Sequence, residues 1–216
     1  MIPLTIRRLL LPIALLSLLG GCASRTEIHS HWTASDNAAQ GYEHVFVLVM
    51  TPEKTISKWI EESIDEHLLP LGVTTTQARK LLTVEDLAAE DVRERVTAAV
   101  RSSGADAVIV ASYLKTESRE EYIPPQITQR PVVVTAPAGP YPALVSYHYE
   151  SLYTPGYYQK NMEYYVQITV YDVGTAEPVW KAQSVTLNPV SAESGVNDFA
   201  QALAKKLHRD GVIKRQ

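Results

Sequence analysis

The chain contains a single cysteine, Cys22, among its 216 residues. One cysteine cannot close a disulfide within a chain, so the fold has to be held together by a hydrophobic core. A chain of this length is long enough to bury such a core. Cys22 therefore does not stabilise the fold by cross-linking, and the residues around it have to indicate its role.

The residues before Cys22 resemble the signal peptide of a bacterial lipoprotein. Arg7 and Arg8 form a basic region, and Leu9–Leu19 is an apolar segment that has the length of a signal-peptide core and is too short to span a bilayer. The sequence Leu19-Gly20-Gly21-Cys22 then resembles a lipobox, in which small residues give a peptidase access to the backbone. The alternative is an ordinary secretory signal that happens to precede a cysteine.

The resemblance implies cleavage between Gly21 and Cys22, which makes residues 1–21 a signal peptide and residues 22–26 a tether. Cys22 would carry a diacylglycerol and an N-acyl chain such as palmitate, and no other cofactor is expected. Stable attachment to a membrane requires more than one acyl chain, and a lipidated cysteine carries at least two. Ala23 and Ser24 stand where lipoproteins retained at the inner membrane often have Asp, so the resemblance implies the periplasmic side of the outer membrane.

The charge of the mature chain argues against a nucleic-acid partner. Removal of residues 1–21 takes away Arg7 and Arg8 and no acidic residue, which changes the formal net charge from −4 to −6. Binding to phosphates requires clustered Lys and Arg, and a mildly acidic domain does not supply it.

The pattern after the tether predicts one domain over residues 27–216. A short alternating segment at 27–32 and a continuous apolar run at 44–50 predict strands, and apolar residues at helical spacing follow from Ile56 to Leu68. Further elements are expected in five ranges: a helix at 86–103, a strand at 105–115, two strands at 163–171 and 179–187, and a helix at 194–209. They predict a mixed α/β (α+β) fold: a single sheet of about five to six strands, partly parallel, with three helices packed on it and a C-terminal antiparallel hairpin.

Residues 117–162 differ from the rest in composition and are predicted to form an excursion from the sheet. They hold 7 of the 13 prolines, which are disfavoured in the interior of a sheet. Residues 132–134 and 144–147 are expected to pair as a hairpin. The candidate interaction surface consists of tyrosines, which offer large and stiff contact areas: Tyr141, Tyr147, Tyr149, Tyr153, Tyr157 and Tyr158. The alternative is that these rings pack back on the domain.

The order of motifs along the mature chain resembles a family of uncharacterised bacterial lipoproteins with a mixed α/β envelope domain. The motifs are a lipobox, a strand with Trp32, Gly72-Val73, Gly104-Ala105-Asp106-Ala107-Val108, Tyr171-Asp172, Val179-Trp180 and Gly211-Val212-Ile213. A looser likeness exists to lipoproteins that assist envelope assembly, whose hairpin turn usually has Thr-Gly where this chain has Gly174-Thr175. The resemblance carries no catalytic residues.

Candidate chemistry outside the tyrosines is sparse. His29 and His31 are two residues apart and would share one face of a strand, where two imidazoles begin a metal site, but no third ligand is evident. The acids at positions 61, 62, 65 and 66 are expected on the solvent side of their helix. We therefore expect a lipid-anchored, non-catalytic binding or assembly-accessory module whose partner is an envelope protein or peptidoglycan. The alternative is an envelope hydrolase or metal-binding enzyme without a recognisable motif, and the oligomeric state stays open.

Overall fold

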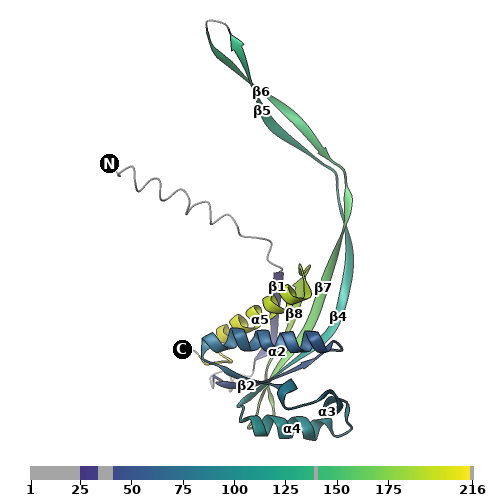
Figure 1. Cartoon of the computed structure of the whole chain (residues 1–216), viewed down its shortest axis with the longest axis vertical. Coiled ribbons are helices and arrows are strands. Elements are labelled where there is room, and N and C mark those ends of the chain that lie inside the picture. The colour runs from purple at the N-terminus through teal and green to yellow at the C-terminus, as the bar shows by residue number, and fades with distance from the viewer. Residues whose placement is uncertain (1–24, 34–40, 139–140, 215–216) are drawn as a thin grey trace, which may run out of the picture. The chain divides into compact units, whose positions relative to one another are not determined.

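The computed structural model describes residues 25–33, 41–138 and 141–214 (Figure 1). The predicted signal peptide, which ends at Gly21, and Cys22 lie outside these residues, whereas Arg25 and Thr26 of the predicted tether belong to a strand. The described chain divides into two compact units. Ser118–Met162 forms one unit, and the residues before and after it form the other.

The larger unit is built on a six-stranded sheet with the strand order β1-β8-β7-β4-β2-β3. Its strands are β1 (Arg25–Thr33), β2 (His44–Met50), β3 (Thr74–Gln77), β4 (Ala107–Ile123), β7 (Tyr157–Asp172) and β8 (Pro178–Leu187). Strand β2 pairs parallel with β3 and β4, whereas β8 pairs antiparallel with β1 and β7. The predicted fold class is confirmed, including the partly parallel sheet and the C-terminal hairpin formed by β7 and β8.

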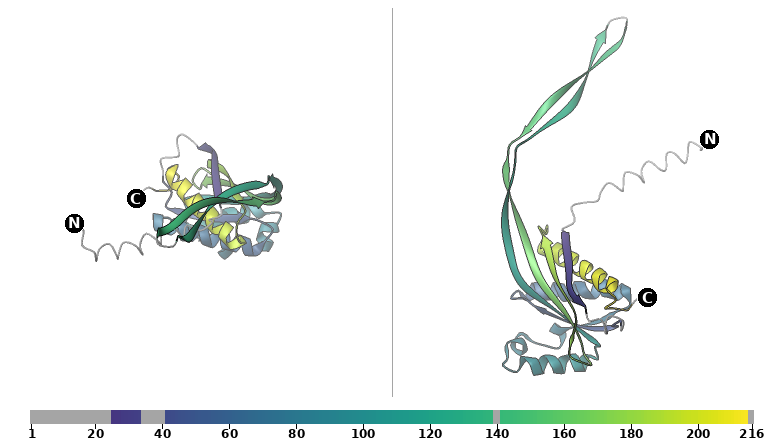
Figure 2. Two further views of the ribbon diagram at one scale, coloured as in Figure 1. Left: turned by 90° about the horizontal axis from the view of Figure 1, so that it is seen from above. Right: turned by 180° about the vertical axis from the view of Figure 1, so that it is seen from behind.

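Helices cover both faces of this sheet. They are α2 (Lys54–Leu68), α3 (Val84–Ala88), α4 (Val92–Ser103) and α5 (Ala192–Arg209), together with the short 3₁₀ turns η1 (Leu69–Leu71) and η2 (Ala78–Lys80). Helices α2 and α5 lie on one face, and α3 and α4 lie on the other, as the views in Figures 1 and 2 agree.

The apolar run of β2 explains why both faces are covered. Its side chains alternate between the two faces of the sheet, as in any strand. Val45, Val47 and Val49 belong to the core beneath α2 and α5. Phe46 and Leu48 belong to the core beneath α4. A strand that is apolar on both sides requires a helical layer on each, and the chain supplies both.

The helix predicted at 86–103 is divided in two. Helix α3 begins at Val84, because the Thr83 hydroxyl accepts a hydrogen bond from the Asp86 N–H while the Asp86 carboxylate accepts one from the Thr83 N–H. The chain leaves the helical conformation at Ala89 and enters α4 after Asp91. Leu87 lies on α3 and is exposed, because the break separates its turn from the buried stripe of α4.

The smaller unit contains a two-stranded antiparallel ribbon of β5 (Gln126–Ala138) and β6 (Tyr141–Thr154). The hairpin expected from residues 132–134 and 144–147 is confirmed, since Val133 pairs with Tyr147 and Val134 with Ser146. A two-stranded ribbon has only edge strands. Pro131 is therefore tolerated opposite Tyr149, where the interior of the main sheet would exclude it.

Candidate functional site

Four of the six predicted interaction tyrosines have described side chains, and all four are exposed. The exposed fractions are 67% for Tyr149, 62% for Tyr153, 51% for Tyr157 and 73% for Tyr158. Tyr141 and Tyr147 lie on β6, and their side chains fall outside the described part of the structure. The ribbon therefore brings Tyr149 and Tyr153 onto one strand, while Tyr157 and Tyr158 begin β7.

The strand register divides the side chains of the β5–β6 ribbon between two faces. Ile127 pairs with Tyr153 and Pro131 with Tyr149, so these four residues share one face, which we call the aromatic face. The opposite face carries the pair Arg130–Glu150, whose side chains approach to 3.7 Å. Ile127 is 70% exposed. The described part of the aromatic face thus presents apolar and aromatic groups to solvent, with the exposed polar pair Gln129–Ser151 between them.

Tyr158 makes a ring contact within its own unit. Its centroid lies 5.1 Å from that of Tyr122, and the two ring planes are tilted by 50°. The Tyr122 ring also packs over Gly156 in the turn before β7, where a Cβ would lie 2.4 Å from the Tyr122 hydroxyl oxygen. One predicted interaction tyrosine therefore also packs against a neighbour.

His29 and His31 lie on β1, whose pairing with β8 shifts register between Ser30 and Trp32. His29 lies 3.7 Å from a Glu27 carboxylate oxygen and is exposed. The His31 side chain lies outside the described part of the structure. Among the described residues, no three His, Cys, Asp or Glu side chains converge in a way that would hold a metal ion.

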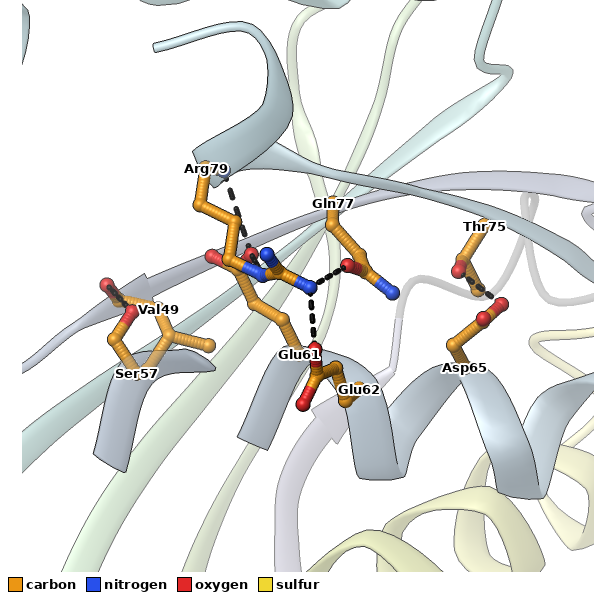
Figure 3. A network of polar contacts seen from close by, with 8 residues as sticks. All are labelled: Val49, Ser57, Glu61, Glu62, Asp65, Thr75, Gln77 and Arg79. Carbon is orange, nitrogen blue, oxygen red and sulfur yellow. Dashed lines mark hydrogen bonds and ion pairs between the residues drawn. The ribbon is translucent and has the colours of Figure 1, made fainter. Parts of the chain in front are cut away.

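The acids of α2 were expected on a solvated face, and for Glu61 this was wrong. Glu61 is 1% exposed, and its carboxylate lies 3.7 Å from the Nε of Arg79 (Figure 3). The backbone N–H of Arg79 donates to the same carboxylate oxygen at 3.4 Å. The Arg79 Nη2 donates to Glu62 and to the Gln77 side-chain oxygen, each at 2.6 Å. Turn η2 thus places the guanidinium group of Arg79 over the helix, where it covers Glu61.

Asp65, one turn further along α2, is also held by a neighbouring element. The Thr75 hydroxyl donates to its Oδ1 at 2.6 Å. This bond ties α2 to β3 (Figure 3). Only Glu66 of the four acids is fully on the solvent side, as expected.

Burial raises the pKa of Glu61 to about 7, although the hydrogen bond and the positive charge of Arg79 both act to lower it. Between pH 4.5 and 7 the folded chain therefore binds more protons than the unfolded chain. Stability should fall as the pH rises through this window and level off above it.

We expect the variant Glu61→Gln to have a flatter pH profile than the native chain. Native stability should drop by about 2–3 kcal/mol between pH 5 and pH 8, and the variant should lose this slope. The lowered pKa values of Asp172 and Asp210 place their titration below this range. Urea denaturation at several pH values measures the slope. Glu66→Gln is the matched control on the same helix and should keep the native dependence of stability on pH. If Glu66→Gln flattened this dependence as much as Glu61→Gln, the slope could not be assigned to Glu61.

The Tyr171-Asp172 motif has a structural role. The Asp172 carboxylate accepts hydrogen bonds from the Tyr42 hydroxyl at 2.9 Å and from the Thr175 N–H at 2.7 Å. Burial opposes ionisation of Asp172, but these bonds outweigh it and hold the pKa of the carboxyl below its ordinary value. The motif therefore closes the β7–β8 turn against the chain that enters β2.

An apolar cleft of about 550 Å³ lies within the larger unit. Its lining comes from the first two turns of α2 and α5, from strands β2, β4, β7 and β8, and from the segments that precede the two helices. The apolar lining includes Ile56, Ile60, Ala111, Val166, Val196 and Phe199. Glu53 is its one charged residue among those described. Small-molecule sites have volumes of roughly 300–1,000 Å³ and are mostly apolar, so the cleft has the dimensions of a binding site.

Sequence reasoning missed this cleft, because its lining comes from positions as far apart as Val49 and Phe199. The one available signal was a set of small residues, Ala192 and Gly195, at the start of a helix whose later turns carry large apolar side chains.

No protein family matches the sequence, and no curated protein matches it. The solved structures that are similar in chain trace include an oligomer and a lipoprotein. The PelC dodecamer from Paraburkholderia phytofirmans is 13% identical, with 88% of this chain and 100% of that chain covered and a TM-score of 0.45. The lipoprotein GNA1162 from Neisseria meningitidis is 11% identical, with 77% and 99% covered and a TM-score of 0.39. One of the two is thus a lipoprotein, and likenesses at these identities and scores assign neither a family nor a function to this chain.

Within the described residues, every helix is too short or too polar to cross a bilayer.

Proposed function

We propose that this chain is a lipid-anchored bacterial envelope lipoprotein that acts as a non-catalytic binding or assembly-accessory module. The observation that carries the anchor is the order of a basic region, an apolar segment and Gly20-Gly21-Cys22 at the N-terminus. The lipid on Cys22 attaches the mature chain to the periplasmic side of the outer membrane. The partner is an envelope protein or peptidoglycan.

The binding surface in this proposal is the aromatic face of the β5–β6 ribbon. Tyr149 and Tyr153 supply area with few torsions to immobilise, which favours binding. A two-stranded ribbon leaves this face without a helical layer of its own unit, so its exposed apolar groups are available to a partner. Aromatic rings of this kind also stack on sugar rings, which makes glycan strands a suitable class of ligand.

We expect the double variant Tyr149→Thr, Tyr153→Thr to lose at least about tenfold in partner capture, since Thr keeps strand propensity and removes the rings. A photoreactive amino acid at Ile127 would capture the partner in cells. Binding to isolated peptidoglycan would be measured by sedimentation.

The matched control is Arg130→Thr, Glu150→Thr, which alters the opposite face and should leave both readouts unchanged. Loss of a crosslinked protein would assign a protein partner, and loss of sedimentation would assign the glycan. Equal capture by the native chain and both variants would refute the aromatic face as a binding surface.

A further inference from the structure

The apolar cleft of the larger unit lies close to the point where the lipidated tether joins the fold. Strand β1 begins at Arg25, which follows Cys22 by three residues. In the antiparallel pairing of β1 with β8, Arg25 lies opposite Leu187 and Thr26 opposite Thr186. The hydroxyl oxygens of Thr26 and Thr186 are 2.9 Å apart, and Thr186 lines the cleft. The start of β1 is therefore one strand away from the cleft wall.

The chemistry of the cleft suits a hydrocarbon chain. Its lining is mostly apolar, and α5 contributes Val196 and Phe199 on one side while α2 contributes Ile56 and Ile60 on the other. The first turn of α5 also contributes two small residues to the lining, Ala192 and Gly195. The hydroxyls of Thr51, Thr116 and Ser191 are also among the lining groups, but the surface of the cleft is mostly apolar, and an acyl chain requires no polar partner.

The lengths also agree. Three extended residues span at most about 10 Å. An acyl chain reaches about half the thickness of the hydrocarbon core, or about 15 Å. The tether and one chain together can thus pass from Thr26 to the cleft that begins at the neighbouring strand.

The geometry points to the cleft as the binding site of one acyl chain of the lipid on Cys22. This inference rests on the lipidation in the proposed function and goes beyond it, because it assigns a protein site to part of the anchor. The link of three residues from Cys22 to Arg25 gives the acyl chain a high effective concentration at the cleft, which a free membrane lipid lacks. The remaining acyl chains stay in the bilayer, so the domain is both attached and held close to the membrane surface.

The test uses the full chain produced in bacteria that are fed a fatty acid with a terminal photoreactive diazirine. The protein is purified in detergent, illuminated and digested, and the crosslinked peptides are identified by mass spectrometry. We expect crosslinks from the lipid on Cys22 to peptides that contain residues 49–60 and 189–199. Crosslinks confined to other peptides would overturn the inference.

Two cleft-filling variants and one control sharpen the test. Ala192→Trp and Thr116→Trp place a large ring at the lining from the helix side and from the sheet side. Each should reduce the crosslinks to the cleft at least about fivefold. Val190→Trp is the control, because Val190 is 79% exposed and lies outside the lining. An unchanged yield in both filling variants would overturn the inference.

The variant Cys22→Ser separates the inference from the proposed function and from free lipid. Photoreactive chains in this variant belong only to membrane lipids, so crosslinks at the native yield would show that the cleft takes a free lipid and would overturn the inference. The mass of the N-terminal peptide of the native chain is measured in the same digest. An unmodified Cys22 would refute the lipoprotein proposal itself, whereas a lipidated Cys22 with crosslinks elsewhere would refute the inference alone.

Discussion

Replacing Trp180 with alanine is expected to lower the free energy of unfolding by about 3–5 kcal/mol. Trp180 is fully buried and is the largest of the fully buried side chains. Its indole N–H donates to the Asp210 carboxylate at 2.9 Å, which ties β8 to the end of α5. Alanine would leave a large cavity and remove this bond. Urea denaturation followed by circular dichroism measures the loss.

Trp32→Ala is the matched control for this prediction. Trp32 is 45% exposed, and its described contact is with the Lys181 amine, 5.8 Å from the ring centroid. An exposed cation–π pair contributes about 0.5–1 kcal/mol, so the control should cost no more than that. Similar losses for the two variants would contradict the assignment of the core.

Trp180→Phe separates packing from hydrogen bonding at the same position. Phenylalanine keeps an aromatic ring but has no donor for Asp210, which retains the Lys206 amine at 2.9 Å as a partner. We expect a loss of about 1–3 kcal/mol, well below that for alanine.

The central strand β2 and the hairpin of β7 and β8 could be predicted because their sequences carry clear strand and turn patterns. The run at 44–50 is apolar on both faces, which is sufficient for a central strand, and the structure buries Val45 to Val49. The hairpin of β7 and β8 could be predicted because two strand-forming segments flank a turn around Gly174.

The environment of Glu61 could not be predicted from the helical pattern. The stripe of Ile60, Ile64 and Leu68 identifies the face that meets the core, and Glu61 lies at its edge. What buries Glu61 is Arg79, which turn η2 brings over the helix from 18 positions further along the chain. The amphipathic pattern describes one contact face, whereas α2 is covered by the sheet, by α5 and by η2.

The ribbon could be predicted in its pairing but not in its chemistry. The apolar segments at 132–134 and 144–147 indicated a hairpin, whereas the register decides which side chains share a face with Tyr149 and Tyr153. A shift of one residue in one direction would pair Tyr149 with Arg130 and Tyr153 with Gln126, so that both tyrosines would share the face of Arg130. The sequence therefore did not predict the aromatic face because the strand register was not known. It did not predict the cleft because the cleft depends on packing between residues far apart in the chain.

Changing Cys22 to alanine is expected to abolish membrane attachment. Each buried CH₂ contributes ~0.8 kcal/mol, so the acyl chains supply nearly all of the binding free energy, and alanine has no thiol to accept them. The variant should accumulate as an uncleaved precursor or as a soluble protein. Fractionation of cells into soluble, inner-membrane and outer-membrane material, followed by mass spectrometry of the N-terminal peptide, measures this.

Ser24→Ala is the matched control, since it alters the tether and keeps the thiol. It should leave both the attachment and the lipid mass on Cys22 unchanged. Fractionation and the mass of the N-terminal peptide are both measured because a lipid or a protein partner could attach the chain to the membrane. A protein partner in the membrane would retain Cys22→Ala, whereas a lipid anchor would not. A mature Cys22→Ala chain that still fractionates with the outer membrane would therefore refute the lipid anchor and assign the attachment to a contact made by the folded domain.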